Sequence, residues 1–490
     1  MLSKRAAIIL KLLFLAPFVV SCHSQGATGA AIPSEYSGGQ IIIDKSGQTY
    51  INNKKIVVGL SDDDISYKRI TTIILGKGRE QEVVRDCSAI AVIKLNGDER
   101  DTLTTVNNVT VINRDTIVMH TKGMVDKYRS QIRSAQHPER PYQYLRFLGM
   151  MSEGEGNKLI NEGVIEIVFD HDPTVDFRVY GFGICGNANS VFINRGEIRF
   201  RGKGTPLTRM RGMGSMADNV TFINEGTISV EVDMAEDVRM ITTGGDYNDI
   251  INNGLMYGRT SGTLIGMTRY GNSNISNNGT IDLTVTKMPG EYKSVLARSE
   301  KFVCGLFEML TAKRKQITPM NNRGTITLSL NGTADEQWTG YGMYFGMLSP
   351  CDANITINNV GSINLNQNDA NITHCMAEAG FISRTNNATT HITIGKWRTA
   401  FREFSITNGL FQGSNVSMDF GTAEIQLEKQ QGYVEGTTYS VAPESLLNST
   451  GNASITNQYI DFDNVSFTSA DNDWQVNRNK KQQTLSLSKE

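Results

Sequence analysis

The chain has few of the residues that build metal sites or disulfide frameworks. Its 490 residues include 6 cysteines and 6 histidines, and neither set shows the spacing of zinc ligands or of paired cysteines. No clustered catalytic signature is present. The sequence therefore predicts no metal and no cofactor; it leaves enzymatic activity open but favours a protein that is not an enzyme.

An excess of charge of either sign is also missing. The 48 basic and 50 acidic residues leave a net charge of −2, so the composition gives no reason to expect nucleic acid as a partner. Proline is scarce at 10, whereas glycine is frequent at 47 and recurs at fixed places. With 39% hydrophobic residues the chain can bury a large core, and a repeat fold accommodates such a length in one dimension.

The N-terminus has the pattern of a secretory signal. A basic start is followed by an apolar run from Ala6 to Val20, which is shorter than the roughly 20 residues that span a bilayer. The run ends in Val-Val-Ser-Cys at positions 19–22, which resembles the lipobox of bacterial lipoproteins. The resemblance implies that residues 1–22 are a signal peptide and that Cys22 carries a membrane-anchoring lipid. An ordinary cleaved signal with a chance cysteine is the alternative.

The residues after Cys22 predict a tether. Residues 23–39 are rich in Gly, Ala and Ser and have few bulky apolar side chains, so we expect a flexible segment. Position 23 is His rather than Asp, which resembles lipoproteins sorted to the outer membrane. We therefore expect the protein in the cell envelope, at the outer membrane, with the periplasmic and the surface face both open.

An internal repeat dominates the rest of the chain. Seven segments place an asparagine two residues before a glycine, between apolar residues. Asparagine and glycine both tolerate positive φ, so each pair is predicted to turn the chain sharply between two strands. The turn residues are Asn161, Gly163, Asn194, Gly196, Asn224, Gly226, Asn252, Gly254, Asn277, Gly279, Asn322, Gly324, Asn359 and Gly361.

The segments around each turn predict strands. After the turn, apolar and polar residues alternate, as in Gly-Thr-Ile-Ser-Val-Glu-Val at 226–232, which indicates one buried and one wet face. A glycine-bearing apolar segment, such as Tyr-Gly-Phe-Gly-Ile at 180–184, precedes the turn. Each unit thus predicts one rung of a three-faced coil, and stacked rungs would align the asparagines into a ladder bonded to neighbouring backbone.

A propeller is the structural alternative, but the repeat is too short for it. The distance from Gly254 to Gly279 is 25 residues, whereas a four-stranded blade needs about 40–45. The pattern resembles the right-handed parallel β-helix of autotransporter passenger domains and related Gram-negative surface proteins, over about residues 100–425. Those families export through a C-terminal barrel, which the polar residues 471–490 do not resemble.

The resemblance implies an all-β fold, a three-faced β-solenoid with a cap at each end. We expect hairpin strands near residues 40–44 and 55–59. Two basic insertions, at 121–144 and 287–315, are either loops on a binding face or solvated loops. The expected divisions are an N-terminal cap with the first strands at 40–100, the repeat at 101–425 and a C-terminal cap at 426–490.

A β-helix by itself does not define a function, so a ligand site must be sought among particular residues. Two groups of residues are candidates. The first is acidic and follows the strands after the turns: Asp170, Asp172, Glu231 and Asp233, with Glu236, Asp237, Arg178 and Arg239 close in sequence. Acidic solvent loops are the alternative interpretation. The second is aromatic, with faces on which sugars stack, and core packing is its alternative; it comprises Trp338, Tyr341 and Tyr344.

Taken together, the sequence favours an envelope-anchored rod that acts as a non-enzymatic binding or adhesin-like protein. Its expected partners are the membrane, through the lipid on Cys22, and a glycan or a host or matrix surface. A carbohydrate-active β-helix enzyme, either a polysaccharide lyase or a hydrolase, is the first alternative. A structural spacer without a ligand is the second.

Overall fold

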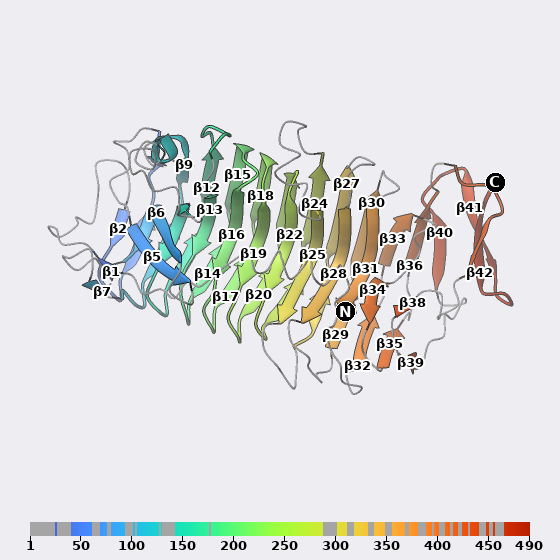
Figure 1. Cartoon of the computed structure of the whole chain (residues 1–490). Coiled ribbons are helices and arrows are strands. Elements are labelled where there is room, and N and C mark those ends of the chain that lie inside the picture. Colours follow the sequence, from blue (N-terminus) through green and yellow to red (C-terminus); the bar gives the residue numbers. More distant parts are fainter. Residues whose placement is uncertain are drawn as a thin grey trace.

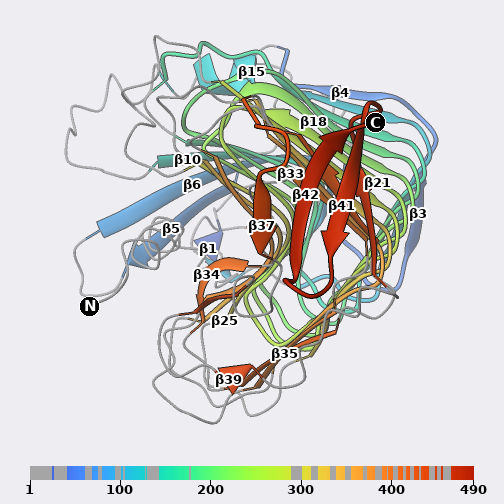
Figure 2. The ribbon, with the colours of Figure 1, turned by 90° about the vertical axis from the view of Figure 1, so that its right-hand side faces the viewer.

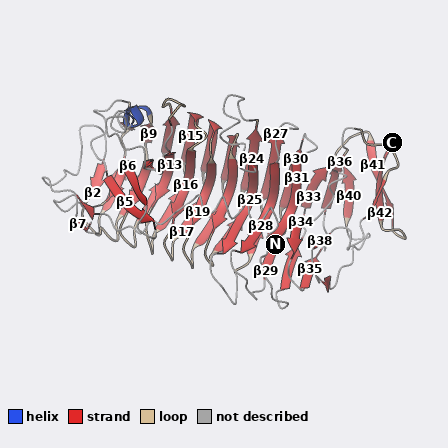
Figure 3. Cartoon of the chain, in the orientation of Figure 1, coloured by secondary structure: helices blue, strands red, loops and turns tan. Residues whose placement is uncertain are grey.

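The protein is an elongated rod of stacked strands (Figure 1). Its computed structural model describes residues 25–26, 41–60, 69–75, 80–93, 101–102, 105–126, 129, 143–175, 178–287, 301–310, 318–331, 338–347, 355–367, 372–380, 389–393, 396–400, 407–411, 415–419, 424–429, 432–440, 447–449, 454–455 and 465–490. Nearly all of these residues lie in strands or turns (Figure 3); the helical ones are 122–126 and 129. No helix within these ranges is long and apolar enough to cross a membrane.

Three long sheets run along the rod; sheets 2 and 3 take one strand from every rung, and sheet 1 does so as far as β31. Sheet 1 contains β2 (Ile41–Ile43), β6 (Glu80–Val92), β10 (Gln143–Ser152), β13 (Arg178–Cys185), β16 (Thr208–Ser215), β19 (Asp237–Thr243), β22 (Thr263–Arg269), β25 (Lys301–Leu310), β28 (Trp338–Met347) and β31 (Ile372–Gly380), with β5 (Arg69–Leu75) beside β6.

Sheet 2 carries the asparagine of each repeat. Its strands are β3 (Thr49–Asn52), β8 (Thr110–Asn113), β11 (Lys158–Asn161), β14 (Val191–Asn194), β17 (Thr221–Asn224), β20 (Asp249–Asn252), β23 (Asn274–Asn277), β26 (Met320–Asn322), β29 (Ile355–Asn359), β32 (Thr389–Thr393), β35 (Asn415–Asp419) and β39 (Ser454–Ile455).

Sheet 3 follows the turn. Its strands are β4 (Ile56–Val58), β9 (Thr116–His120), β12 (Val164–Phe169), β15 (Glu197–Gly204), β18 (Thr227–Met234), β21 (Leu255–Thr260), β24 (Thr280–Thr286), β27 (Thr325–Asn331), β30 (Ser362–Gln367), β33 (Lys396–Ala400), β36 (Glu424–Glu428) and β40 (Ser466–Ser469).

Every strand of these sheets, apart from β5, pairs in parallel with its neighbours one rung away. The register keeps equivalent residues in columns, as where Asn161 lies opposite Asn194 and Ile165 opposite Ile198. The right-handed parallel β-helix predicted from the sequence is confirmed. Twelve strands in sheets 2 and 3 correspond to a rod about 50 Å long at a strand spacing of about 4.8 Å.

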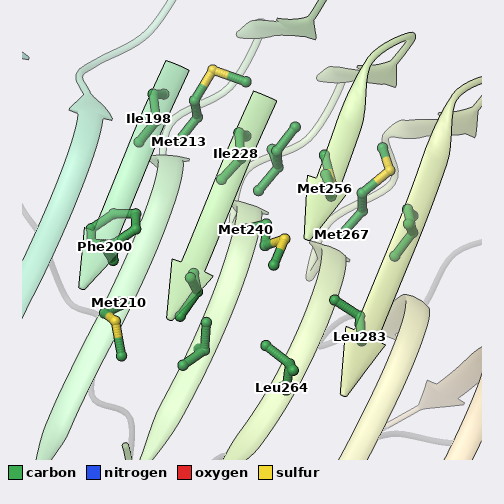
Figure 4. Packing of buried hydrophobic residues seen from close by; sticks show 14 of the residues in the cluster. Ile198, Phe200, Met210, Met213, Ile228, Met240, Met256, Leu264, Met267 and Leu283 are labelled. Atoms are coloured by element: carbon green, nitrogen blue, oxygen red, sulfur yellow. The ribbon is translucent and has the colours of Figure 1, made fainter. Parts of the chain in front are cut away.

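The core fills the space between the sheets with columns of aliphatic, methionine and phenylalanine side chains. Figure 4 shows Ile198 and Phe200 of β15 facing Met210 and Met213 of β16 across the interior. All four are fully buried. Each truncation of such a side chain to alanine should cost about 2–5 kcal/mol, so the columns are a main source of stability.

The asparagines form a continuous ladder from Asn52 to Asn359. Each Nδ2 donates to the Oδ1 of the next rung over 2.7–2.9 Å. The same group also donates to backbone carbonyls, as Asn161 does to Glu197 at 3.0 Å. The expected ladder is present, but its main acceptor is the neighbouring amide and not the backbone alone.

The turn glycines are needed for a reason different from the one the sequence suggested. They are not among the residues with left-handed φ. Instead, a Cβ on Gly196 would lie 1.9 Å from the backbone oxygen of Gly163, one rung away. Left-handed residues occur at the other corner of the rung, just before sheet 2, at Asn108, Gly156, Asn189, Asn219 and Tyr247.

The ends of the rod differ from the expected caps. The predicted hairpin is wrong: Ile41–Ile43 pairs with β6 and Ile56–Val58 with β9, both in parallel, so these strands belong to the first rung. The parallel rungs likewise continue past residue 425, through β36 to β40. The antiparallel strands β37 (Thr438–Ser440), β41 (Trp474–Asn479) and β42 (Thr484–Lys489) lie across the C-terminal end (Figure 2).

Smaller pairings complete the fold. β1 (Gln25–Gly26) pairs with β7 (Asp101–Thr102), and β34 (Thr407–Phe411) pairs with β38 (Leu447–Ser449). Residues 287–315 are not one continuous insertion, contrary to the prediction, because β25 within this range is a regular strand of sheet 1. Residues 1–22, including Cys22, lie outside the described residues, as does the expected tether except for β1.

Candidate functional site

The outer face of sheet 1 is unusual because most of its described side chains between β13 and β28 are buried. In β16 and β19 every residue is buried, on both faces of the strand. The apolar outward residues also form a hydrophobic cluster separate from the core. We call this face the outer strip; its members are Arg178, Tyr180, Arg209, Arg211, Glu236, Asp237, Arg239, Ile265, Tyr270, Cys304, Phe307, Met309, Tyr341 and Tyr344.

The register of sheet 1 brings the charged members together. Tyr180 lies opposite Arg209, which lies opposite Asp237 on the next rung. In a second column, Arg211 lies opposite Arg239. Because residues two apart on a strand share a face, the Arg-x-Arg of β16 and the Asp-x-Arg of β19 place four charges on one patch.

Glu236, just before β19, binds two arginines from different rungs. Arg209 donates to its carboxylate through Nε at 2.8 Å and Nη2 at 2.7 Å. Arg178 donates to the same carboxylate at 3.1 and 3.3 Å. Their side-chain exposures are 3% for Arg209, 11% for Arg178 and 17% for Glu236. Arg178 and Glu236 are therefore the members of this group that reach solvent.

Asp237 holds the second pair of arginines. It accepts from Arg211 Nη2 at 2.5 Å and from Arg239 Nε at 3.0 Å. Burial alone would raise the pKa of Asp237, but Arg211 and Arg239 outweigh it and hold the pKa below its usual range. Burial lowers the pKa of Arg239 to about 10 against the opposing effect of Asp237. Asp237 and Arg239 are consequently both charged at neutral pH.

Tyr180 joins the network through its hydroxyl and its ring. Arg209 Nη1 donates to the hydroxyl at 2.8 Å, and the Arg209 guanidinium also lies 5.5 Å from the ring centroid. Burial raises the pKa of Tyr180, so the phenol stays protonated. Removing one partner from a buried ionic network of this kind costs about 3–5 kcal/mol. The arginines are therefore held in fixed positions.

The strip continues into an aromatic end on the following rungs. The Arg239 guanidinium lies 5.2 Å from the ring centroid of Tyr270, which packs edge-on against Phe307. Phe307 stacks on Tyr344 at 5.2 Å, and Tyr344 contacts Tyr341 at 5.1 Å. Charged and aromatic side chains thus form one contact path from β13 to β28.

The aromatic residues predicted from the sequence belong to this path. Tyr341 and Tyr344 lie together, but both are 3% exposed and pack in the outer cluster, separate from the core. They are not open stacking surfaces for a sugar. The side chain of Trp338 lies outside the described residues. Tyr270, a partly buried ring at the edge of the same cluster, was not predicted.

The four predicted acidic residues form two pairs that lie two rungs apart, one after β12 and one on β18. Asp170 and Asp172 are bonded to residues 120–122 and to Arg129. Glu231 and Asp233 are exposed on β18, on the outer face of sheet 3. In the described part of the chain no three acidic, histidine or cysteine side chains are grouped as they would be around a metal ion.

The charged residues next to the acidic candidates, and not the candidates themselves, lie on the outer strip. Arg178 and Arg239 do pair with Glu236 and Asp237, as their proximity suggested. Arg209 and Arg211 were missed. The signal for them was available: both sit at alternating positions of a glycine-bearing apolar strand, Thr-Arg-Met-Arg-Gly-Met-Gly-Ser at 208–215, whose inward residues are methionines.

Comparison with known proteins is informative for the first half of the chain. Residues 23–244 match the family model of the BigA third pectate lyase-like domain. The match covers less than half of the chain, and it shows that this region is similar to a pectate lyase-like β-helix domain. It contains the whole charged end of the outer strip, whereas Tyr270 and the other residues of the aromatic end follow it. No curated protein and no solved structure matches the chain.

Proposed function

We propose that this protein binds an acidic polysaccharide on the outer strip of sheet 1, without cleaving it, while anchored to the cell envelope. The observation that carries the proposal is the network of four arginines on that face, within the pectate lyase-like region. Guanidinium groups bind carboxylates and sulfates in a bidentate manner that a lysine does not reproduce. A uronate or sulfated sugar chain therefore suits this face better than a neutral glycan.

The members of the strip divide the work of binding. Arg178, at 11% exposure, is the guanidinium placed to meet a carboxylate from solvent. Arg209 and Glu236 fix its position from the neighbouring rungs. Tyr270 supplies a partly exposed ring that Arg239 orients from beneath. Successive rungs lie about 4.8 Å apart, so three rungs separate the two contacts along the axis by about 14 Å, enough for a short oligosaccharide.

Localisation in the envelope is part of the same proposal. The apolar leader ending in Cys22 supports export and lipid attachment, and the pectate lyase-like match begins at the next residue. Cys22→Ser should abolish incorporation of a labelled fatty acid and release the protein from the membrane fraction. Retention of both label and membrane association in Cys22→Ser would contradict lipid attachment, independently of any ligand.

Binding to polygalacturonate, compared with a neutral polysaccharide, tests the ligand assignment. Arg178→Ala should weaken binding to the acidic polymer about tenfold or more, since one charge-assisted contact is worth about 1.5–3 kcal/mol. Arg201→Ala is the matched control, because Arg201 is an exposed arginine on the outer face of sheet 3 that also pairs with a glutamate. Equal losses in both variants, or no binding by wild type, would overturn the assignment.

A polysaccharide lyase is the second candidate, favoured by the adjacent carboxylates of Glu236 and Asp237 among four arginines. Lyase chemistry needs a base to remove a proton next to a uronate carboxylate, and a cation to stabilise the charge that develops. Release of unsaturated uronides from polygalacturonate, lost in Glu236→Gln, would establish this activity and refute the non-enzymatic proposal. A structural spacer would show neither binding nor release.

A further inference from the structure

The loop after β12 is fastened to a segment that comes about fifty residues earlier in the chain. Asp170, His171 and Asp172 contact residues 120–122 and Arg129, on the preceding rung. We call these three residues the clasp. Residues 122–126, which the clasp holds, are helical (Figure 3) and open the basic stretch at 121–144.

Asp170 provides the first part of the clasp. Its Oδ1 accepts from the backbone N–H of Thr121 at 3.1 Å and of Lys122 at 3.0 Å, and its Oδ2 lies 2.7 Å from His120 Nδ1. The first N–H groups of a helical segment have no partner within the segment. Asp170 therefore caps residues 122–126 from a neighbouring rung, in the way that an N-cap aspartate does locally.

His171 provides the second part, and it is buried. Its exposure is 4%, its Nδ1 lies 2.7 Å from the Thr121 hydroxyl, and its ring packs edge-on against Phe169. Among the described residues its Nε2 has no hydrogen-bond partner. A protonated ring would place a positive charge in a buried position and would leave its Nε2–H without an acceptor. The closed clasp therefore requires the neutral ring.

Asp172 provides the third part. Arg129 donates to its Oδ2, while its Oδ1 accepts from the backbone N–H and the hydroxyl of Thr174 at 2.9 and 2.7 Å. The bonds from Thr174, together with Arg129, hold the pKa of Asp172 well below its usual range. The Asp172 carboxylate therefore stays charged until the solution is strongly acidic, and it does not take up a proton before His171 does as the pH falls.

Each segment next to the His171 loop carries a titratable or charged group. Asp170 and Asp172 lie on its own loop; the segments beside that loop carry His120 at the end of β9, Lys122, Asp126 and Arg129 on the helical stretch, and Lys203, which follows the β15 residue paired with Phe169.

We propose that the clasp opens on acidification, when His171 takes up a proton, and that it then frees residues 121–126 from the rod. Burial lowers the pKa of His171 to about 4, although Asp170 and Asp172 act to raise it; the ordinary value is 6.5. An open clasp returns the ring to solvent and to its ordinary pKa. Acid therefore favours the open form, by up to about tenfold for each pH unit below 6.5 and no further below 4.

Hydrogen exchange, corrected for intrinsic rates, tests the proposal in the full chain. The Gly123 and Val125 amides bond to Gly59 O and Thr121 O, so they report the closed state. Their protection should fall about tenfold per pH unit between pH 6.5 and 4. The amides of Gly196 and Gly226, bonded within the asparagine ladder, should keep theirs. Unchanged protection at Gly123 and Val125 down to pH 4 would overturn the proposal.

His171→Gln separates titration from packing, because glutamine can bond Thr121 but cannot take up the proton. The variant should hold its protection at pH 4.5, and an acid loss equal to that of wild type would refute the role of His171. If the variant is already open at pH 7, the titration of the His171 ring in wild type decides. A midpoint that coincides with the loss of protection supports the proposal, and a ring that titrates at 6.5 in the closed state contradicts it.

Discussion

At the scale of single residues, the contacts between neighbouring rungs determine which residues recur at each position of the repeat. Asparagine suits the ladder because its amide both donates and accepts a hydrogen bond. In a column of stacked asparagines, each side chain therefore finds a donor on one side and an acceptor on the other. Glycine suits the turn because the neighbouring backbone leaves no room for a Cβ. A carbonyl oxygen already lies 1.9–2.2 Å from the Cβ position at six consecutive turns from Gly163 to Gly324. The two residues are thus selected by stacking, which is absent in an isolated turn.

Gly196→Ala tests this view of the turn. The added methyl group would meet Gly163 O at 1.9 Å, so we expect a loss of about 2–3 kcal/mol in the free energy of unfolding. Gly214→Ala is the control, since its nearest neighbour is a side-chain methyl group at 3.2 Å that can shift. Denaturant unfolding followed by circular dichroism measures both. Equal stabilities for the two variants would mean that close stacking is not the reason for the glycine.

Much of this scale could be predicted from the sequence, because the repeat is local. The Asn-x-Gly spacing and the alternation after it determine the turns, the columns and the fold class. The reason for the glycines could not be inferred from the sequence. A positive φ and a lack of space for a Cβ both select glycine, so the sequence looks the same in either case. The misassigned hairpin has a similar cause: alternation in Ile41–Ile43 and Ile56–Val58 predicts strands but not whether their partners run parallel.

At the scale of elements, sheet 1 carries most of the buried charged side chains among the described residues. Its strands place four arginines and two carboxylates on the outer strip, and a further pair, Arg269 and Glu308, in a fully buried position on adjacent strands. The candidate site could not be assembled from the sequence, because its charged members alone lie on three rungs and meet only through the register. Of the acidic candidates, Asp170 and Asp172 belong to the clasp, and Glu231 and Asp233 are exposed on sheet 3.

The Glu308 carboxyl predicts a pH dependence of stability. Burial raises the pKa of Glu308 to about 7, even though Arg269 beside it acts in the opposite direction. A carboxyl whose pKa is raised in the folded state stabilises fully below its ordinary value of 4.5. That contribution is lost as the pH rises toward 7, because the unfolded chain releases the proton first. Glu308→Gln should remove this loss.

Unfolding free energies at several pH values provide the measurement. Relative to Glu308→Gln, wild type should become progressively less stable between pH 4.5 and 7 and then level off. Comparison with the variant cancels the opposite trend that His171 contributes, since that group loses stability as the pH falls from 6.5 to 4. A constant difference between wild type and Glu308→Gln across this range would contradict the raised pKa.

At the scale of the whole molecule, the rod separates support from recognition. The asparagine ladder and the apolar columns run through residues 23–244, which match the pectate lyase-like family model, and beyond them, and they are structural wherever they occur. Within the described residues, sheet 1 alone combines fixed arginines with an aromatic path along several rungs. In the proposed account, the leader positions the rod at the envelope, sheet 1 holds the acidic ligand, and the clasp adjusts the first rungs to pH.

A crystal structure with a bound oligogalacturonate tests the central claim most directly. The account predicts a sugar carboxylate on the guanidinium of Arg178, and a chain that runs over β13 to β22 toward Tyr270. The arginines around Glu236 and Asp237 should keep their positions. An oligosaccharide bound instead to the outer face of sheet 2 or sheet 3, with the outer strip of sheet 1 unoccupied, would contradict it.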